Sequence, residues 1–259
     1  MDDGLRVEVD GAVAILTLDR PAALNALTVP LKVALLEALR QIASDRAVRA
    51  VILTGAGRAF CAGQDLAERE RPDAAPLDVE LRERYNPIVR ALREMGQPVI
   101  AAVNGVAAGA GASLAFACDL RVAAADARFV LAFGRIGLVP DSGATWFLPR
   151  LVGAGRATEL ALVGDPVSAE DALRIGLVSR VVPGEALMTE ARAMADRLAA
   201  SAPAALAMTK AALERSWSMD LGSALDEEAR LQGLAGSSAD HSEGLAAFRE
   251  KRPPRFTGE

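Results

Sequence analysis

Two carboxylates border an apolar, glycine-rich stretch over residues 98–141, and both have the chemistry to move a proton. A carboxylate among apolar neighbours loses solvation, which raises its pKa and makes it a better base near neutral pH. Asp141 follows an apolar Leu-Val-Pro run and opens a predicted helix, so it is interpreted as a base, as a helix N-cap, or as both. Asp119 starts a predicted strand, where a turn residue bonded to backbone N–H groups is the favoured interpretation and catalysis is the second one.

Between the two acids, the sequence predicts a corner that can bind an oxyanion. The apolar run over residues 99–103 predicts a strand, and an Ala/Leu-rich pattern that ends at Cys118 predicts a helix. Gly109, Ala110 and Gly111 lie between them. The first N–H groups of a helix have no partner within it and carry partial positive charge, and glycine lets a ligand approach the backbone closely.

Nucleotide binding and serine hydrolysis fit the sequence less well. The glycine turns at 55–57 and 109–111 both lack the third glycine of a dinucleotide motif, and no GxxxxGK[ST] pattern occurs. Ser113 lies in a segment similar to a nucleophile elbow, but the last glycine of that motif is missing. His241, the only histidine, lies among polar residues and is interpreted as a solvated helix-start residue.

The composition is that of a soluble enzyme. Of 259 residues, 51% are hydrophobic and 24% charged, and the net charge of -5 indicates no general attraction to nucleic acid or to an anionic membrane. Cys61 and Cys118 lack metal-ligand spacing, and the N-terminus lacks the basic and apolar regions of a signal peptide. We therefore expect reduced thiols, no metal and a cytoplasmic location.

The order of predicted elements favours an α/β core. Two alternating runs over residues 5–19, joined at Asp10-Gly11, predict a hairpin, and strands then alternate with helices. The charged, proline-containing segment 68–77 predicts a surface loop. After the central stretch strands nearly vanish, so we expect an α/β body over residues 1–200 and a helical part over 201–259.

Five segments together resemble the enoyl-CoA hydratase/isomerase (crotonase) superfamily, and the similarity spans the whole chain. The segments are PAALNAL (21–27), GAGRAFCAGQDL (55–66), PVIAAVNGVAAGAGASLAFACDL (98–120), IGLVPDSGAT (136–145) and AFREKRPPRFTG (247–258). The resemblance implies a spiral of ββα repeats with a helical C-terminal trimerisation region. It also implies an acyl-CoA thioester as substrate and no cofactor, since coenzyme A is part of that substrate.

The resemblance further implies which residues form the site. In that superfamily two backbone N–H groups bind the thioester oxygen, and the matching positions here are Gln64 and Ala110. This agrees with the predicted oxyanion corner, because preorganised donors stabilise the charge that develops on an enolate. The residues implied to bind the substrate and its coenzyme A are Ala22, Ala23, Leu24, Ala62, Gly63, Asp65, Leu66, Gly109 and Phe133.

The sequence departs from the hydratases of the superfamily at two positions. Ser113 and Phe133 stand where those enzymes carry two glutamates that activate water, so addition of water is not expected. Asp141 matches the place where several isomerase branches keep their acid/base carboxylate.

Details such as AGQDL, YNPIVR and GLVPDSGATWFLPR look most like the ring 1,2-epoxyphenylacetyl-CoA isomerases of phenylacetate degradation. The alternatives are a general 3-enoyl-CoA to 2-enoyl-CoA isomerase, a hydratase-like enzyme, or a non-catalytic CoA-binding relative. The implied assembly is a homotrimer or a dimer of trimers. A complex with a hydratase of the same pathway is left open.

Overall fold

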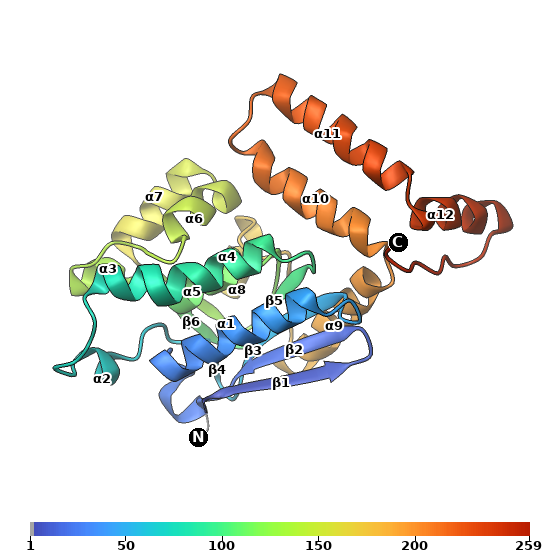
Figure 1. Cartoon of the computed structure of the whole chain (residues 1–259). Coiled ribbons are helices and arrows are strands. Elements are labelled where there is room, and N and C mark those ends of the chain that lie inside the picture. The colour runs from blue at the N-terminus through green and yellow to red at the C-terminus, as the bar shows by residue number, and fades with distance from the viewer. Residues whose placement is uncertain (1–2) are drawn as a thin grey trace.

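The computed structural model describes residues 3–259, which form two β-sheets covered by helices (Figure 1). The strands are β1 (Leu5–Asp10), β2 (Val13–Leu18), β3 (Ala50–Gly55), β4 (Ala59–Cys61), β5 (Val99–Val103), β6 (Val106–Ala108), β7 (Leu120–Ala124), β8 (Arg128–Val130), β9 (Val167–Ser168) and β10 (Arg180–Val182). The α-helices are α1 (Val29–Ser44), α2 (Leu66–Arg69), α3 (Leu77–Glu80), α4 (Asn86–Glu94), α5 (Ala110–Ala117), α6 (Ala144–Val152), α7 (Ala154–Val163), α8 (Ala169–Arg174), α9 (Leu187–Ala199), α10 (Pro203–Ser216), α11 (Leu221–Gly236) and α12 (Ala239–Glu250). Three 3₁₀ turns (Pro21–Ala23, Ala132–Ile136 and Gly184–Ala186) and a π-helical turn (Leu81–Tyr85) complete the elements of the described range.

The two sheets are built from successive strand pairs. The larger sheet has the order β1-β2-β3-β5-β7-β10, and the smaller has the order β4-β6-β8-β9. Each of the pairs β3–β4, β5–β6 and β7–β8 places its first strand in the larger sheet and its second in the smaller one. This arrangement is the spiral of ββα repeats that the sequence predicts, and its effect is to bring the turns after β4 and β6 to neighbouring positions.

The central strands are parallel and buried. β2, β3, β5, β7 and β10 pair in parallel, and every residue of β3 and β5 is buried. Strands covered on both faces read as continuous apolar runs, which explains why the sequence predicts them well. The predicted hairpin at Asp10-Gly11 is confirmed, since β1 and β2 are antiparallel and Gly11 has a φ of 61° that suits a tight turn.

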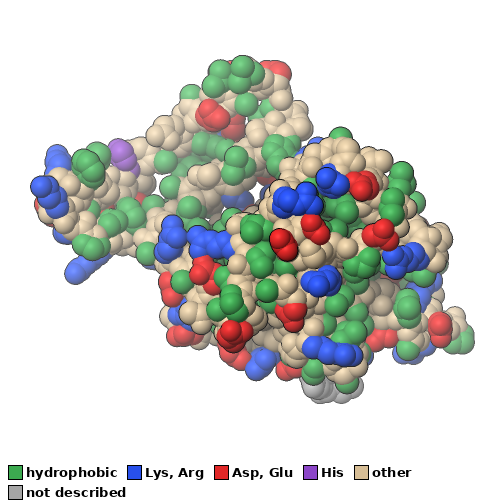
Figure 2. Space-filling model, turned by 180° about the vertical axis from the view of Figure 1, so that it is seen from behind, with side chains coloured by type: hydrophobic (Ala, Val, Ile, Leu, Met, Phe, Trp, Pro, Cys, Tyr) green, Lys and Arg blue, Asp and Glu red, His purple; other side chains and the backbone are tan. Residues whose placement is uncertain are grey.

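The residues after 202 form a C-terminal arm, made of α10, α11, α12 and the tail to residue 259, which projects from the α/β body (Figure 1). None of the residues of α10 is buried. Eight large hydrophobic side chains of the arm are exposed: Leu213, Trp217, Met219, Leu221, Leu225, Leu234, Leu245 and Phe248. Seen from behind, the arm stands out from the body and carries the single histidine at its surface (Figure 2).

The structure differs from the elements that the sequence predicts in the segment 68–77 and in several short strands, since β4, β6 and β9 of the smaller sheet were not predicted. The segment 68–77 is a loop only over its middle, because α2 and α3 form its ends. After the central stretch two short strands follow, β9 and β10, and β10 completes the larger sheet by pairing with β7. β10 has three residues, and a strand that short carries too few positions for an alternating pattern to be read.

Candidate active site

A cavity of about 390 Å³ lies where the turns after β4 and β6 meet the segment 77–85. Its walls contain eight of the predicted residues: Ala62, Gly63, Gln64, Leu66, Gly109, Ala110, Phe133 and Asp141. Leu77, Glu80, Leu81 and Tyr85 also line it. Such a chamber, mostly apolar and with few polar groups, is typical of a small-molecule site.

The Gln64 N–H points into this cavity because a hydrogen bond holds the C=O group on the opposite side of the same peptide. The N–H of Leu27 donates to the Gly63 oxygen at 2.7 Å, and the N–H of Asp65 donates to the Leu27 oxygen at 3.2 Å. In a trans peptide the C=O and the N–H point in opposite directions, so the Gln64 N–H points away from Leu27. Within residues 3–259 no protein oxygen accepts a hydrogen bond from it.

The Ala110 N–H is the second unpaired donor. Ala110 is the first residue of α5, and the Gly109 oxygen on the other side of its peptide accepts the N–H of Ser113 at 3.1 Å. The Ala110 N–H therefore points out of the helix start, where partial positive charge gathers. In the described part of the chain it has no acceptor.

Two glycines allow the donor turns to approach one another. A Cβ on Gly63, whose φ is 92°, would lie 2.8 Å from the Ala108 oxygen and 3.4 Å from the Ala110 nitrogen. A Cβ on Gly111 would lie 2.2 Å from the Cys61 oxygen. These distances place the Gln64 and Ala110 peptides side by side, as an oxyanion hole requires.

Asp141 and Glu80 are the two carboxylates that line the cavity in the described structure, and their surroundings differ. Burial raises the pKa of Asp141, and its one polar partner is the Ser142 hydroxyl, which donates at 2.9 Å. Burial also acts to raise the pKa of Glu80, but hydrogen bonds from Lys32 and Arg84 outweigh it, so the pKa lies below its ordinary value. Asp141 is therefore the carboxylate that can take up a proton.

Asp141 is not a helix N-cap. The cap position of α6 is Gly143, and no side chain caps this helix. The Asp141 backbone oxygen accepts from Ala144, which leaves its carboxylate to the cavity and to Ser142. Ser142 has a φ of 52°, in the left-handed region that is uncommon for residues other than glycine.

Asp119 lies outside the lining of the cavity. Its carboxylate accepts from Arg93 at 3.1 Å, pairs with Lys210 at 2.8 Å, and accepts the Val99 N–H at 2.8 Å. These contacts join α4, β5 and α10. They favour the structural role over the catalytic one.

The remaining predicted residues lie beside the cavity. Ala22, Ala23 and Leu24 form a turn next to Ala62, whose N–H donates to the Leu24 oxygen at 2.9 Å. Asp65 caps α2 and accepts from Arg20 at 2.8 Å. Burial acts to raise the pKa of Asp65, but the Arg20 contact and the backbone donors bring it below its ordinary value.

The residues considered for serine hydrolysis form no site. Ser113 is buried in α5, and its hydroxyl donates to the Gly109 oxygen at 3.2 Å. His241 lies exposed in α12 on the arm (Figure 2). Neither residue lines the cavity.

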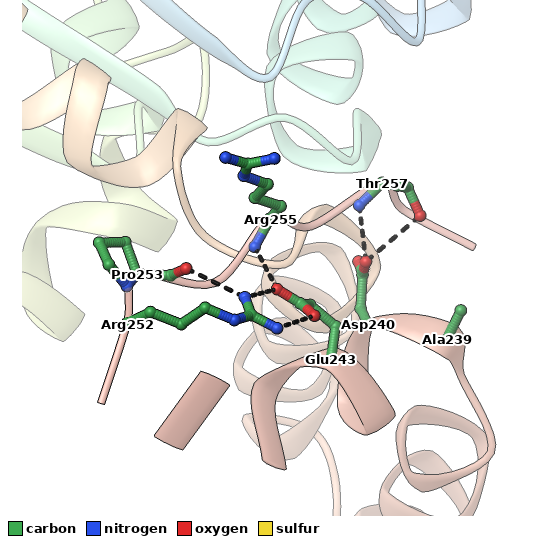
Figure 3. A pocket seen from close by; sticks show the side chains of 7 residues that line it. All are labelled: Ala239, Asp240, Glu243, Arg252, Pro253, Arg255 and Thr257. Carbon is green, nitrogen blue, oxygen red and sulfur yellow. Dashed lines mark hydrogen bonds and ion pairs between the residues drawn. The ribbon is translucent and has the colours of Figure 1, made fainter. Parts of the chain in front are cut away.

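A second hollow, of about 560 Å³, lies between α12 and the C-terminal tail (Figure 3). Glu243 accepts two hydrogen bonds from Arg252, at 2.5 and 2.9 Å, and one from the Arg255 N–H at 2.8 Å. Asp240 accepts the Thr257 N–H at 2.6 Å. The polar groups here satisfy one another and fasten the tail to the helix, so this hollow offers no convergent reactive group.

The sequence did not predict three polar residues at the cavity, of which Glu80 and Tyr85 line it and Lys32 lies behind them. Lys32, Glu80 and Tyr85 form a buried network with Gln64, which the hydrogen bonds of all four side chains connect. One signal was available: Lys32 shares an apolar helix face with Leu35, because the two are three residues apart. Glu80 follows the segment 68–77 that is predicted as a loop, where no periodic pattern marks it. Tyr85 shares helical spacing with Ile88 and Leu92, which predicts a buried face but not the partner of its hydroxyl.

Two searches of the described residues bear on other chemistries. No group of three or more His, Cys, Asp and Glu side chains within residues 3–259 is arranged to hold a metal ion. Among the helices of the same range, none combines the length and the apolar composition that a membrane crossing needs.

Comparisons with known proteins agree with this geometry. The family profile of enoyl-CoA hydratase/isomerase matches residues 8–259. A Rhodobacter capsulatus protein named "Probable enoyl-CoA hydratase" is 47% identical over 254 residues, 98% of each chain. The 1,2-epoxyphenylacetyl-CoA isomerase of Escherichia coli K12 is 46% identical over 253 residues, 96% of this chain and 97% of that protein.

The fold is also similar to that of a solved structure. The enoyl-CoA hydratase of Bacillus anthracis matches with a TM-score of 0.94 at 37% identity, over 99% of this chain and 100% of that one. The relatives thus divide between proteins named as hydratases and one named as an isomerase, while the fold is shared with the solved structure. The chain belongs to the enoyl-CoA hydratase/isomerase (crotonase) family.

Proposed function

We propose that the protein is an acyl-CoA isomerase, and that its substrate is ring 1,2-epoxyphenylacetyl-CoA, which it converts to the oxepin form in phenylacetate catabolism. The observation that carries this proposal is a single carboxylate, Asp141, that lines the cavity without a cationic partner, beside two unpaired backbone donors. One base and one oxyanion hole are sufficient for a proton shift next to a thioester.

In this mechanism the thioester oxygen lies against the N–H groups of Gln64 and Ala110. Asp141 removes a proton from the carbon next to the thioester, and the charge moves onto the oxygen. The C–C bond shared by the epoxide and the six-membered ring breaks as the π electrons redistribute, which gives the seven-membered oxepin ring. The protonated Asp141 then returns the proton to a ring carbon further along the conjugated system, so no atom is gained or lost overall. Each donor is worth about 3–4 kcal/mol of transition-state stabilisation, the cost of removing one from comparable sites.

Two candidates share this apparatus with the proposed reaction. A 3-enoyl-CoA to 2-enoyl-CoA isomerase needs the same proton removal and return. Enoyl-CoA hydration is supported by the names of several relatives, the Rhodobacter capsulatus protein among them. Against hydration, Ser113 and Phe133 carry no carboxylate, and Glu80 is held by Lys32 and Arg84.

The test compares three substrates under one set of conditions. Enzymatically made epoxyphenylacetyl-CoA, 3-hexenoyl-CoA and crotonyl-CoA are each incubated with the protein, and products are followed by mass and absorbance. Isomers keep the mass of the substrate, whereas hydration adds one water. We expect isomerisation to exceed hydration by at least ~100-fold, because positioned acid–base groups for water are missing. Comparable hydration of crotonyl-CoA contradicts the proposal.

We also propose that the protein works as a trimer or as a dimer of trimers. The arm exposes Trp217 at 42% and Phe248 at 85%, and at the cavity edge Val139 is exposed at 78%. Soluble monomers rarely expose so much apolar surface, and a second copy of this chain is the occupant that the arm fits. Size-exclusion chromatography with light scattering should give about three or six chains, and a monomer at micromolar concentration contradicts this.

A further inference from the structure

A buried lysine lies directly behind the proposed oxyanion hole. The side chain of Lys32, on α1, is fully buried, and its ammonium pairs with Glu80 and donates to the Gln64 Oε1 at 3.0 Å. It also lies 4.6 Å from the centre of the Tyr85 ring. Burying an ammonium group costs free energy unless the group is paired and hydrogen-bonded. Lys32 can occupy this buried position because the fold supplies such partners.

The Gln64 side chain is held at both of its polar atoms. Its Oε1 accepts from the Lys32 ammonium and from the Tyr85 hydroxyl at 2.6 Å, and its Nε2 donates to the Asp65 oxygen at 3.2 Å. Lysine offers donors only, so it fixes which end of the amide faces it. The Tyr85 hydroxyl must therefore donate to the same oxygen.

The Gln64 peptide has few other anchors. On its N-terminal side stands Gly63, which has no side chain and a φ of 92°. The Leu27 bond holds the oxygen of that peptide, but a plane fixed at one atom can still tilt. Through its own hydrogen bonds, the Gln64 side chain anchors the peptide that carries the N–H donor.

The two groups that hold Gln64 come from different elements of the fold and meet at the same oxygen atom. Lys32 comes from α1, and Tyr85 ends the π-helical turn that links α3 to α4. Such turns are rare and frequently occur at functional sites. Glu80, at the end of α3, fixes Lys32 and is itself held by Arg84.

We propose that Lys32 and Tyr85 are positioning residues that clamp the Gln64 side chain and so hold its backbone N–H on the thioester oxygen, with Glu80 keeping Lys32 in place. This inference rests on the proposed function, because it assigns the supports of that oxyanion hole. Neither residue touches the reacting atoms. Their contribution is geometric, since a displacement of about 1 Å near a reaction centre can cost about 100-fold in rate.

The test measures how strongly the site polarises a thioester. The probe is hexanoyl-CoA labelled with carbon-13 at the thioester carbonyl, which is saturated and cannot isomerise. Its carbonyl stretch is recorded by difference infrared spectroscopy, free and bound to the protein. Hydrogen bonds from the two N–H groups lower the stretching frequency, so the shift reports the quality of the donors.

Tyr85→Phe removes one oxygen atom, and Lys32→Met removes the charge at similar length. We expect both variants to show a smaller downshift than the unchanged protein. Their kcat for 3-hexenoyl-CoA should fall by about 10-fold to 100-fold with little change in KM, less than the loss of a whole donor. Tyr85→Phe is the variant that keeps its fold if loss of the Lys32 partner of Glu80 destabilises Lys32→Met.

Lys210→Met is the matched control. Lys210 is a second lysine whose side chain is largely covered, at 9% exposed, and it forms an ion pair with Asp119 at 2.8 Å, outside the cavity. This variant should lower the melting temperature and leave the carbonyl shift and kcat unchanged. Gln64→Ala supplies a second arm, because it removes the clamped side chain but keeps the backbone N–H. In that background Tyr85→Phe should have no further effect on the shift.

The outcomes separate this inference from the proposed function. A downshift in the unchanged protein that persists undiminished in Tyr85→Phe and Lys32→Met overturns the clamp and leaves the oxyanion hole standing. The absence of any downshift in the unchanged protein overturns the oxyanion hole and the clamp with it. Equal effects of Lys210→Met and Lys32→Met on the carbonyl shift would also refute the clamp, since the effect would then follow from loss of stability alone.

Discussion

Asp119 and Asp141 stand at the ends of apolar segments that look alike in the sequence, yet the structure gives them opposite surroundings. Asp119 is contacted by Arg93 and Lys210, whereas Asp141 has the Ser142 hydroxyl alone. The carboxylates of both residues are largely shielded from solvent. The Asp119 carboxylate joins elements through its cationic partners, whereas burial without such partners raises the pKa of Asp141.

The largest expected effect is on the turnover of Asp141→Asn. Asparagine keeps the size of the side chain and can still accept from Ser142, but it cannot take up a proton. Turnover of 3-hexenoyl-CoA should fall by about 10²–10⁴, the usual contribution of a general base, with little change in acyl-CoA binding. Steady-state kinetics and calorimetric binding measure the two quantities. A variant that keeps near-normal turnover would remove Asp141 from the mechanism.

Asp119→Asn should act on stability instead. It leaves Arg93 and Lys210 without their shared anion, and removing one partner of a partly buried ion pair costs about 2–3 kcal/mol here, since the Val99 N–H keeps an acceptor. The melting temperature at fixed protein concentration should fall by roughly 5–10 °C. Turnover of the folded variant should stay within about twofold. A folded but inactive Asp119→Asn would show that the two roles had been exchanged.

The pH profile tests the same contrast without a substitution. Asp141 must be ionised to accept a proton, and burial raises its pKa, so kcat/KM should fall as pH decreases through a midpoint above the ordinary aspartate value of about 3.9. Circular dichroism over the same pH range controls for unfolding. A midpoint at or below the ordinary value would show that the acid limb does not belong to a desolvated carboxylate.

The smallest expected effect is on the free energy of unfolding, which the buried Asp141 carboxylate lowers at neutral pH. A carboxyl whose pKa is raised in the folded state contributes stability below its unfolded pKa, and this contribution is lost as pH rises through the folded pKa. Asparagine at position 141 does not ionise, so Asp141→Asn does not lose this stability as pH rises. At neutral pH its melting temperature should therefore exceed that of the unchanged protein by roughly 2–4 °C, and the difference should vanish below about pH 4. A variant that melts lower at neutral pH would show that Asp141 is stabilised by contacts as an anion.

The backbone elements of the site could be predicted from the sequence because their signals are local. Strand β5, the glycine turn and helix α5 follow one another within twenty residues, and each has its own periodicity or turn chemistry. The first N–H groups of a helix are unpaired by construction, so donors at this corner follow from the helix start, while the family resemblance names Ala110. Gln64 required the family resemblance, since the bridge that aims its N–H involves Leu27, far away in the sequence.

The surroundings of the side chains could not be predicted in the same way. Asp119 meets Lys210 across ninety-one positions of the chain, and Lys32 meets Glu80 across forty-eight. No local pattern records such pairings, so the sequence left both acids as candidates. The short strand β10 was missed for a related reason, because its place in the sheet is set by pairing with β7 and not by its own three residues.

The close packing of Gly111 against Cys61 limits which substitutions this protein can accept during evolution. The charge-stabilising groups are main-chain atoms, so exchanging the side chains at 64 or 110 does not delete them. A methyl group on Gly111, by contrast, would meet the Cys61 oxygen at 2.2 Å and wedge the two donor turns apart. Substitutions can therefore exchange the carboxylates around the cavity, while the two proposed donors remain because they are main-chain atoms.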